Sequence, residues 1–571
     1  MSEYKNPFEY EAASKLPPET IRRIYIQDYN FTRFIESKRN AFLLGERGSG
    51  KSMALLYNSF KVRNHKELRN GTPAQYDYIG IYVPCKTPYF HKKEYELFLD
   101  EFHQVIYSEH CLCLSIAFEL IDALSMDQTL LDGDLSRKLK EEFSYIFLAE
   151  LLESSDFFSA TKQYIQQEQI KTQRFVNRPL KEEFYEDSLT FPALILPLLN
   201  IIKKIPALKD SHFIFLIDDA HDLNPFQKKL INSWIAYREH TLLSFKVASA
   251  SKEEYDYLTI SGGTIVEHHD FLVIDMEEDI YNNFSPFGKL AKELLQKRLE
   301  IAEINVRVED FFPEHEQVVK DLERSKEKAR TEAIAKNPNA TPKQIQDYIY
   351  KLSRSIYFRE RKDRANLPPY AGLEILINLS TGVVRNLLDP CYWMYDACYS
   401  SSKEKPIDHI PASIQDDIII KHSKAMWEKI KTIHKSIRDC TPKQSDMIYN
   451  LFNNLARLFK ERQKKHKSEP GAIVFTISAM TPELREKIIP LLNIARSAQL
   501  LYQRSSTAKN YGDIETYYVP NRMLYPIRGL DPVGQHARVS IKAIEIWNAA
   551  NGKPFVYVEE GEPTQKGLFN E

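Results

Sequence analysis

The sequence predicts an α/β fold in which helices cover both faces of a parallel sheet. Short, fully apolar runs alternate with longer amphipathic stretches through the first half of the chain. Strands buried on both faces of a sheet are apolar throughout, and helices usually connect parallel strands. A glycine-rich run follows the first apolar run, and two aspartates follow the third. Both features are expected at the sheet edge where ligands bind.

The strands of this sheet are expected at five apolar runs. They are residues 41–44, 78–84, 213–217, 245–249 and 271–274. Amphipathic periodicity predicts helices between them. These helices are expected from residue 51 to about residue 60 and around residues 92–126, 135–170 and 187–204.

The 571 residues exceed what one ordinary core holds, so several domains are expected. The predicted division is an α/β core over residues 1–290, a helical lid with a charged insertion over 291–400, and a C-terminal domain over 407–571. Within the lid, Thr341-Pro342-Lys343-Gln344 predicts a helix start, with threonine as the N-cap and proline at the first position.

Composition predicts a cytoplasmic protein without a membrane segment. The six cysteines are scattered without metal-ligand spacing, and such sparse usage fits a reducing compartment. The N-terminus has no apolar signal-type core, and apolar windows such as residues 191–202 are too short to span a bilayer. The formal net charge of −2 neither implies nor excludes a nucleic-acid partner.

The C-terminal domain is expected to be winged-helix-like. Its elements are predicted in the order helix, strand, helix, helix, strand, loop, strand, which is the order of a winged helix-turn-helix. The second helix of the helix-turn-helix is expected at residues 490–502. The last two strands are expected at 517–519 and 537–540, joined by a turn-rich loop that forms the wing.

A phosphate-binding loop is predicted directly after the first strand. The run fits the pattern GxxxxGK[ST] and consists of Gly45, Glu46, Arg47, Gly48, Ser49, Gly50, Lys51 and Ser52. Glycines let successive backbone N–H groups point at phosphates, and the following helix N-terminus adds positive potential. Lys51 is expected at the β- and γ-phosphates of ATP, and the Ser52 hydroxyl at Mg²⁺.

The second half of the nucleotide site is expected at the ends of neighbouring strands. Asp218 and Asp219 follow the third strand, so Asp218 would hold Mg²⁺ through water and Asp219 would orient or deprotonate the attacking water. Ser249 and Ser251 end the next strand, where a hydroxyl could reach the γ-phosphate or its water, or serve only as a turn former.

With these pieces in order, the chain resembles the AAA+ ATPases, and within them the origin-recognition and cell-division-control initiator-like group of bacteria and archaea. The matching segments are Asn6-Pro7-Phe8, the Walker A run 45–52, the Walker B run 217–221, Ser249 at sensor 1 and Gly382-Val383-Val384-Arg385 at sensor 2. The resemblance implies ATP and Mg²⁺ as cofactors, ATP hydrolysis, a helical lid and a C-terminal winged helix. It also implies that Arg385 contacts the γ-phosphate.

Two departures from that family bear on activity. The second Walker B carboxylate is usually glutamate, whereas Asp219 is one methylene shorter, so hydrolysis is expected to be slow. No arginine lies between Lys246 and Lys297, where an arginine finger is common. Arg238 is the nearest candidate, and the missing finger puts the standard ring assembly in doubt.

Double-stranded DNA is one expected partner of the C-terminal domain, and a partner effector protein is the other. A recognition helix in the major groove and a basic helix end would contact bases and phosphates. The candidate residues are Asn493, Arg496, Gln499, Arg504, Arg522, Arg528, His536 and Arg538, with Arg462, Lys464, Lys465 and Lys467 for phosphates.

These features favour an ATP-controlled switch that binds DNA or a partner protein, in bacterial DNA processing or anti-phage defence. Two alternatives stay open. One is a signalling or scaffold protein that binds nucleotide and rarely turns it over, which Asp219 favours. The other is a replication or plasmid-maintenance initiator that reads a defined DNA site. Oligomerisation is compatible with each of them.

Overall fold

The computed structural model describes the chain in segments, which form two compact units. The described segments are residues 6–9, 12–26, 32–63, 76–85, 93–98, 100–178, 185–237, 242–250, 255–276, 286–361, 369–401, 407–437, 440–465, 472–507, 514–533 and 538–556. The N-terminal unit is Glu11–Glu277, and the C-terminal unit combines Met1–Tyr10 with Glu278–Glu571. This division does not test the expected boundary between lid and C-terminal domain, so the three-domain organisation stays a prediction.

A five-stranded parallel sheet forms the centre of the N-terminal unit, as the sequence predicts. Its strand order is β2-β3-β4-β1-β5. The strands are β1 (Ala41–Leu44), β2 (Tyr78–Pro84), β3 (His212–Asp218), β4 (Leu243–Ser249) and β5 (Leu272–Asp275). Every residue of β3 and β4 is buried, which explains the apolar run Phe213–Ile217 in β3, whereas β4 also buries Ser244, Lys246 and Ser249.

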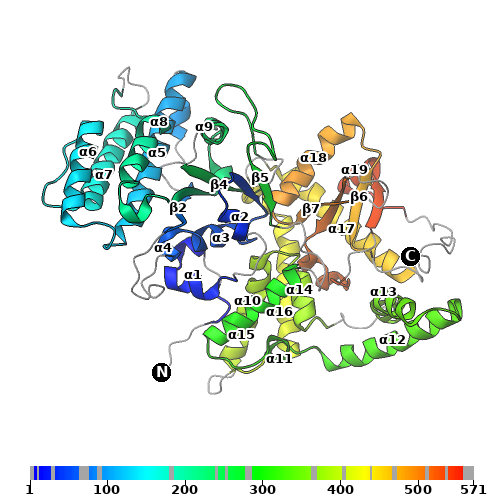
Figure 1. Ribbon diagram of the computed structural model, residues 1–571. Helices are drawn as coiled ribbons and strands as arrows, with labels where there is room; N and C mark the ends of the chain where they lie inside the picture. The colour runs from blue at the N-terminus through cyan, green and yellow to red at the C-terminus, as the bar shows by residue number, and fades with distance from the viewer. Residues whose placement is uncertain are drawn as a thin grey trace. The chain divides into compact units, whose positions relative to one another are not determined.

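Helices cover both faces of this sheet (Figure 1). On one face, Ile214 and Leu216 of β3 pack in a core cluster with α1 (Pro18–Ile24), α3 (Lys51–Tyr57) and α4 (Phe60–Arg63). On the other face, Phe213 and Phe215 pack with α5 (Glu101–Ser125), α8 (Phe191–Ile202) and α9 (Pro225–Ala236). The alternation of neighbouring residues between the two faces is the period of a β-strand.

A helical insertion lies between β2 and β3. Besides α5 and α8 it contains α6 (Gly133–Phe147) and α7 (Phe157–Val176), and aspartates cap α5, α6 and α7. The buried Glu109 of α5 accepts hydrogen bonds from the backbone of Phe191 (3.0 Å) and the indole of Trp234 (3.2 Å). Glu109 thereby fixes the start of α8, where the N-cap Thr190 makes no side-chain cap.

The apolar helix α8 is too short to span a bilayer, as expected, but the sequence reasoning did not consider the longer apolar helix α5. Among the described residues, α5 alone is long and apolar enough to cross a membrane by length and composition. Of its apolar window, 72 % is buried inside the molecule, and the core helix of a soluble protein meets the same criteria.

The helical part of the C-terminal unit has its own core. It is built from α10 (Pro286–Ile301), α11 (Val308–Phe311), α14 (Leu373–Leu379), α15 (Val384–Ser401) and α16 (Ala412–Ile430). Phe8, from the beginning of the chain, is fully buried in this core. Asn6 donates to the Tyr392 carbonyl at 2.9 Å, and Arg298 donates to the carbonyls of Pro7 and Glu9.

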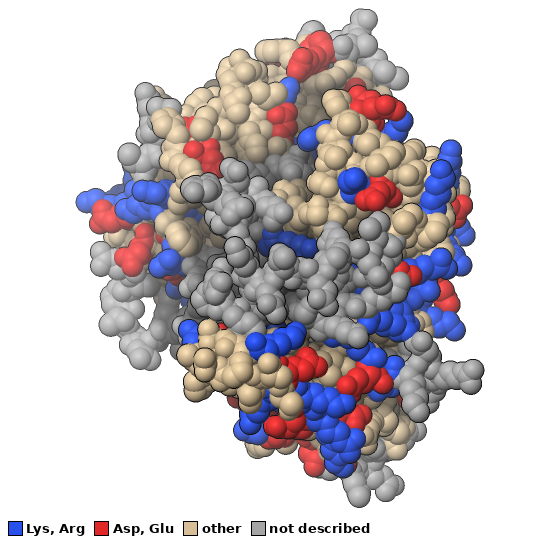
Figure 2. Space-filling model, turned by 90° about the vertical axis from the view of Figure 1, so that its right-hand side faces the viewer, with Lys and Arg blue, Asp and Glu red and all other residues tan. Residues whose placement is uncertain are grey.

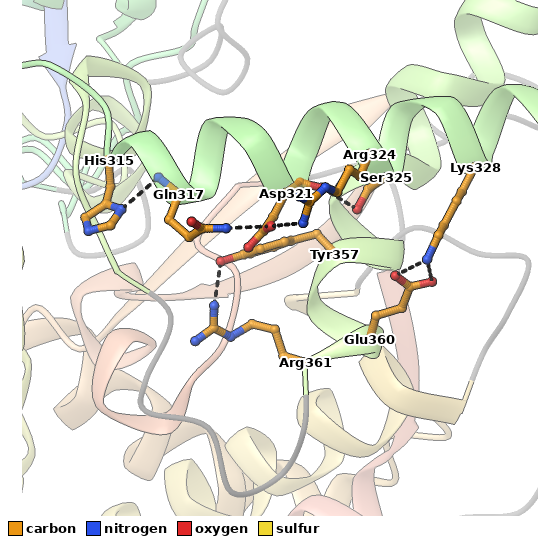
Figure 3. A network of polar contacts seen from close by, with 9 residues as sticks. All are labelled: His315, Gln317, Asp321, Arg324, Ser325, Lys328, Tyr357, Glu360 and Arg361. Atoms are coloured by element: carbon orange, nitrogen blue, oxygen red, sulfur yellow. Dashed lines mark hydrogen bonds and ion pairs between the residues drawn. The ribbon is translucent and has the colours of Figure 1, made fainter.

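The charged insertion of the lid is a helical hairpin of α12 (Glu316–Lys336) and α13 (Pro342–Glu360), which lie side by side (Figure 1). The predicted start of α13 is confirmed, because Thr341 and Gln344 form a capping box with Pro342 at the first position. Polar contacts run along the hairpin, and the contact between Lys328 of α12 and Glu360 of α13 joins the two helices (Figure 3). Small buried residues, Ala329 and Ala333, let the helices approach closely.

The C-terminal part of this unit contains a mixed four-stranded sheet in the order β7-β8-β6-β9. Its elements are α17 (Pro442–Lys465), β6 (Val474–Ser478), α18 (Pro482–Ser497), β7 (Leu501–Thr507), β8 (Ile514–Pro520), β9 (Arg538–Lys542) and α19 (Ala543–Ala550). β6 pairs antiparallel with β8 and parallel with β9.

Two details of the expected winged helix are wrong. First, α18 is one continuous helix with Pro490 inside it, so residues 490–502 do not form a separate second helix. Second, the hairpin is β7–β8, whereas β9 follows a connector at residues 521–533 and pairs with β6. The sequence predicts the end of a helix at residues 501–502, because Leu501 and Tyr502 continue the apolar spacing of α18, but these residues begin strand β7.

Candidate nucleotide-binding site

The predicted phosphate loop joins β1 to α3 in the N-terminal unit. β1 ends at Leu44, residues 45–50 form the loop, and α3 begins at Lys51. Gly48 and Gly50 have φ angles of 90° and 103°, in the left-handed region that glycine adopts without steric cost. This backbone aims the N-terminus of α3 at the loop, as an anion-binding site requires.

Lys51 lies over its own loop. Its side chain is 7 % exposed, and its amine donates to the carbonyl oxygens of Gly45 (2.5 Å) and Glu46 (3.0 Å). The ammonium group is therefore held at the mouth of the loop by backbone acceptors. A charged amine in this position can transfer its hydrogen bonds to phosphate oxygens.

The two expected Mg²⁺ ligands are brought together from segments far apart in the chain. Asp218, at the end of β3, is 2 % exposed, and the nearby Ser52 hydroxyl of α3 lowers the pKa of its carboxyl group. The carboxylate accepts hydrogen bonds from the Tyr82 hydroxyl at 2.7 Å and from the Asp219 backbone N–H at 3.0 Å. Burial raises the pKa of Asp218, Asp219 raises it further, and the hydroxyls of Ser52 and Tyr82 lower it.

Tyr82 was missed from the sequence. It belongs to β2 and is paired with Leu216 of β3, so its hydroxyl reaches the carboxylate that ends β3. Only the order of strands in the sheet places Tyr82 there, and that order is not apparent from the spacing of residues along one chain.

Asp219 begins the short turn that follows β3. Its φ angle is 54°, a left-handed conformation that aspartate adopts more readily than most residues, and its side chain is half-buried. The same turn carries Asp222, whose carboxylate lies 3.9 Å from the Arg47 guanidinium of the phosphate loop. This ion pair, also missed from the sequence, joins the two halves of the site.

Polar atoms at this site are buried without hydrogen bonds. Ser249 ends β4, is paired with Leu44 of β1, and is fully buried. The hydroxyls of Ser49 and Ser249 and Nδ1 of His221 make no hydrogen bond within the described part of the chain. Because an unpaired buried polar group costs free energy, such atoms fit a site that receives a polar ligand. The donor set therefore fits the phosphates of ATP with Mg²⁺.

Three other expected site residues are not placed at the phosphate loop. Arg385 is an exposed residue in the first turn of α15, in the C-terminal unit, so its contact with nucleotide stays a prediction. Ser251 and Arg238 lie outside the described residues.

Several residues expected to contact DNA are instead buried. The side chains of Arg496, Arg504 and Arg522 belong to residues that are 7 %, 7 % and 2 % exposed. Two others cover aromatic rings, with Arg528 4.1 Å from the Trp427 ring centroid and Arg538 4.0 Å from that of Tyr517. His536 and Lys467 lie outside the described residues.

Exposed basic residues do occur near the end of α17, including Arg457 and Lys464. On the face drawn in Figure 2, Lys and Arg side chains are interspersed with Asp and Glu. The exposed charge of the described residues on that face is therefore mixed, and it does not by itself define a path for DNA.

Comparisons with known proteins bear on the family to which the chain belongs. A sequence model of the ORC-CDC6-like family matches residues 6–541. Among solved structures, the chain is similar to Cdc6p from Pyrobaculum aerophilum at 11 % identity and a TM-score of 0.30, covering 91 % of this chain and 94 % of that one. It is also similar to the Aeropyrum pernix Orc1 protein, solved in complex with DNA, at 10 % identity and a TM-score of 0.27, covering 87 % and 91 %. No curated protein matches this chain.

Proposed function

This chain belongs to the ORC-CDC6-like family, and on that premise we propose that it is an ATP-dependent switch whose nucleotide state controls its binding to double-stranded DNA. The family implies nucleotide-binding ATPase activity in general. The observation that carries the proposal for this chain is that the phosphate loop meets the end of β3: the Ser52 hydroxyl lowers the pKa of Asp218, and the Arg47 guanidinium lies 3.9 Å from the Asp222 carboxylate.

The residues of the site have distinct roles in this proposal. The backbone of residues 45–52 and the Lys51 ammonium would hold the phosphates, and Ser52 and Asp218 would hold Mg²⁺. The bound MgATP supplies the phosphoryl group whose loss resets the switch. Asp219 would position the attacking water, and its short side chain would make hydrolysis slow.

DNA is the partner we propose for the C-terminal domain. The β7–β8 hairpin and the exposed basic end of α17 are the features that support it, because phosphate contacts need exposed Lys and Arg. The setting that we propose is bacterial DNA processing or anti-phage defence, in which an effector protein would supply any nuclease chemistry.

The first test is steady-state ATPase activity of the purified chain, with and without double-stranded DNA. We expect slow turnover that DNA alters and that Lys51→Ala and Asp218→Ala abolish, since both remove contacts to phosphate or Mg²⁺. Equilibrium DNA binding measured with and without ATP should differ by about 5- to 150-fold, the usual size of coupling between two sites. Equal DNA affinity in both states would contradict the switch.

A second candidate, a nucleotide-binding scaffold with little turnover, is favoured by one observation. The carboxylate after Asp218 is Asp219 rather than the longer glutamate. If side-chain length limits hydrolysis, Asp219→Glu should raise kcat by about 100-fold, the lower end of what a well-placed general base contributes. ATP binding without turnover in both forms would favour the scaffold.

A further inference from the structure

The connector between β8 and β9, residues 521–533, is a buried part of the C-terminal unit. The sequence predicted a wing loop here. In the structure, Asn521, Arg522, Met523 and Leu524 are each at most 5 % exposed. A buried irregular segment must satisfy its backbone and side-chain polar groups internally. The residues that hydrogen-bond these buried polar groups therefore show to which elements the connector is attached.

Arg522 of the connector is hydrogen-bonded to the turn between α14 and α15, which we call the sensor turn (residues 378–386). Its backbone N–H donates to the Thr381 hydroxyl at 3.0 Å, and its guanidinium donates to the Asn378 amide oxygen at 2.7 Å. The guanidinium also donates to the Pro532 carbonyl at 3.0 Å, within the connector. A buried guanidinium that lost these acceptors would leave an unsatisfied charge, so the contact resists separation.

Apolar side chains cross between the same two segments. Val383 of the sensor turn is fully buried in the core of the C-terminal sheet and its helices. In the opposite direction, Met523 of the connector packs in the core of the lid helices. Each segment thus contributes a side chain to the other's core, and neither can shift alone without opening a cavity.

A third contact flanks Arg385 directly. Asn386, the next residue, donates from its amide to the Tyr502 hydroxyl of β7 at 3.0 Å and to the Ser380 carbonyl at 3.2 Å. Asn521 of the connector donates to the same Tyr502 hydroxyl at 3.3 Å. The four-stranded sheet and the helices that pack on it form what we call the C-terminal sheet domain. In the sequence, Arg385 therefore lies between two residues, Val383 and Asn386, that both contact this domain.

The connector is also attached to α13, to the residue Tyr370 before α14 and to α16. Arg354 of α13 forms a bidentate pair with Asp531 at 2.6 and 2.8 Å. The Tyr370 hydroxyl, before α14, donates to the Leu530 carbonyl at 3.0 Å. The Trp427 indole of α16 donates to the Leu524 carbonyl at 2.8 Å. A bidentate guanidinium–carboxylate pair fixes orientation as well as distance.

We propose that the connector transmits the nucleotide state from the sensor turn to the C-terminal sheet domain, with Arg522 as the positioning residue that couples them. The inference rests on the proposed function, because it requires that nucleotide binding shifts the sensor turn. A ligand shifts a conformational equilibrium only by its differential contacts with the two states. Because the sensor turn is hydrogen-bonded to the connector and packed into the core of the C-terminal sheet, a nucleotide that shifts the sensor turn must also shift the sheet.

The test is hydrogen–deuterium exchange of the full chain with and without adenylyl imidodiphosphate and Mg²⁺. We expect the nucleotide to change deuterium uptake both in residues 378–388 and in the connector of the wild-type protein. In Asn378→Leu and Arg522→Met, the change should persist in 378–388 and be lost in the connector. Nucleotide affinity, measured separately by titration, should stay within a few-fold of wild type in both variants.

Two further variants control for disruption of packing. Asn378→Asp keeps an acceptor oxygen for Arg522 and should restore the change in the connector. Arg528→Met removes a nearby connector arginine that covers Trp427, and it should leave the change intact. Asn378 is only half-buried, so Asn378→Leu provides the answer should Arg522→Met fail to fold.

Each outcome bears on the inference. Unchanged uptake in the connector of a wild-type protein that binds nucleotide would overturn it, as would an unaltered response in Asn378→Leu. A wild-type protein that does not bind nucleotide would remove the proposed function, and the coupling with it. The titration separates this failure from the other two.

Discussion

Lys246 is a fully buried lysine in the middle of the N-terminal sheet. It lies in β4, paired with Ala41 of β1, and its amine donates to the carbonyls of Ser37 (2.8 Å) and Arg39. Burial lowers the pKa of Lys246 to about 7. The amine thus ties the chain that precedes β1 to the sheet, at the end opposite the phosphate loop.

This pKa predicts a pH-dependent stability. The unfolded lysine has a pKa of about 10.4, so between about pH 7 and pH 10 the unfolded state binds more protons and stability rises with pH. We expect the free energy of unfolding to rise by up to about 1.4 kcal/mol per pH unit from this group. Lys246→Met should flatten that rise. Urea unfolding of the wild type and of Lys246→Met at pH 7, 8 and 9 measures this rise. Equal slopes of the unfolding free energy against pH in the two proteins would show that Lys246 is not its source.

Gly80 of β2 allows a close approach by the end of α3. A Cβ atom at this position would lie 2.2 Å from the backbone oxygen of Asn58. Gly80→Ala should therefore destabilise the N-terminal unit by about 1–3 kcal/mol, the usual cost of overpacking. Gly133→Ala is the matched control, because a Cβ there meets nothing within 4 Å. Denaturation midpoints that fall equally in both variants would count against this reading.

Some residues of the nucleotide site could be predicted from the sequence, and others could not. Lys51 and Ser52 could be predicted because a phosphate loop needs those residue types at that spacing, and Asp218 because it directly follows an apolar strand. The approach of Asn58 to Gly80 and of Tyr82 to Asp218 depends on which strand lies beside which. That order is set by tertiary packing, and no local pattern encodes it.

The course of helix α18 could not be predicted from the sequence either. Pro490 inside this helix lacks the N–H that would continue the backbone ladder, and its ring crowds the preceding turn. The sequence reading placed a helix start there because proline favours the first position of a helix. Both arrangements put proline in a helical conformation, so composition alone does not separate them.

A substitution at Pro490 distinguishes one continuous helix from two helices. Because Pro490 is exposed inside a continuous helix, Pro490→Ala should stabilise the C-terminal unit by about 2 kcal/mol, somewhat less than the full interior penalty of proline. If Pro490 instead began a second helix, the same change would be neutral or destabilising. Thermal unfolding followed by far-ultraviolet circular dichroism distinguishes the two, with Pro482→Ala at the true helix start as the control.

The strands of the N-terminal sheet were predicted within a residue or two, since each contains a short apolar run that packs in the core. β7 of the C-terminal sheet was not predicted as a strand, whereas β9 was predicted as a strand but with the wrong partner. The residues of β9 alternate between polar and apolar, whereas β7 is polar after Leu501 and Tyr502. The pairing that makes them strands comes from β8 for β7 and from β6 for β9. Long-range pairing overrides the weak local preference of such segments.

For the whole molecule, the first ten residues belong to a different unit from the strand they precede. Met1–Tyr10 is grouped with Glu278–Glu571, whereas β1 and the phosphate loop belong to Glu11–Glu277. The sequence marked Asn6-Pro7-Phe8 only as part of a family resemblance. Its place in the lid core depends on Phe8 meeting Phe311 and Phe312, some 300 residues away.

Phe8→Ala should therefore weaken the C-terminal unit and spare the nucleotide site. Phe8 is fully buried, and its ring centroid lies 6.0, 5.6 and 6.2 Å from those of Phe311, Phe312 and Tyr395. Removing a buried phenylalanine costs about 3–5 kcal/mol, so exchange should accelerate in residues 287–312 and 387–398. Protection of β1 and α3, and titrated ATP affinity, should match wild type.

Phe102→Ala is the control, because Phe102 is 68 % exposed at the start of α5 and its loss should leave both regions unchanged. Faster exchange in β1 and α3 of Phe8→Ala, or weaker ATP binding, would show that the two units unfold together. Loss of Phe8 can destabilise the lid core and leave the phosphate loop folded only if the two units unfold independently.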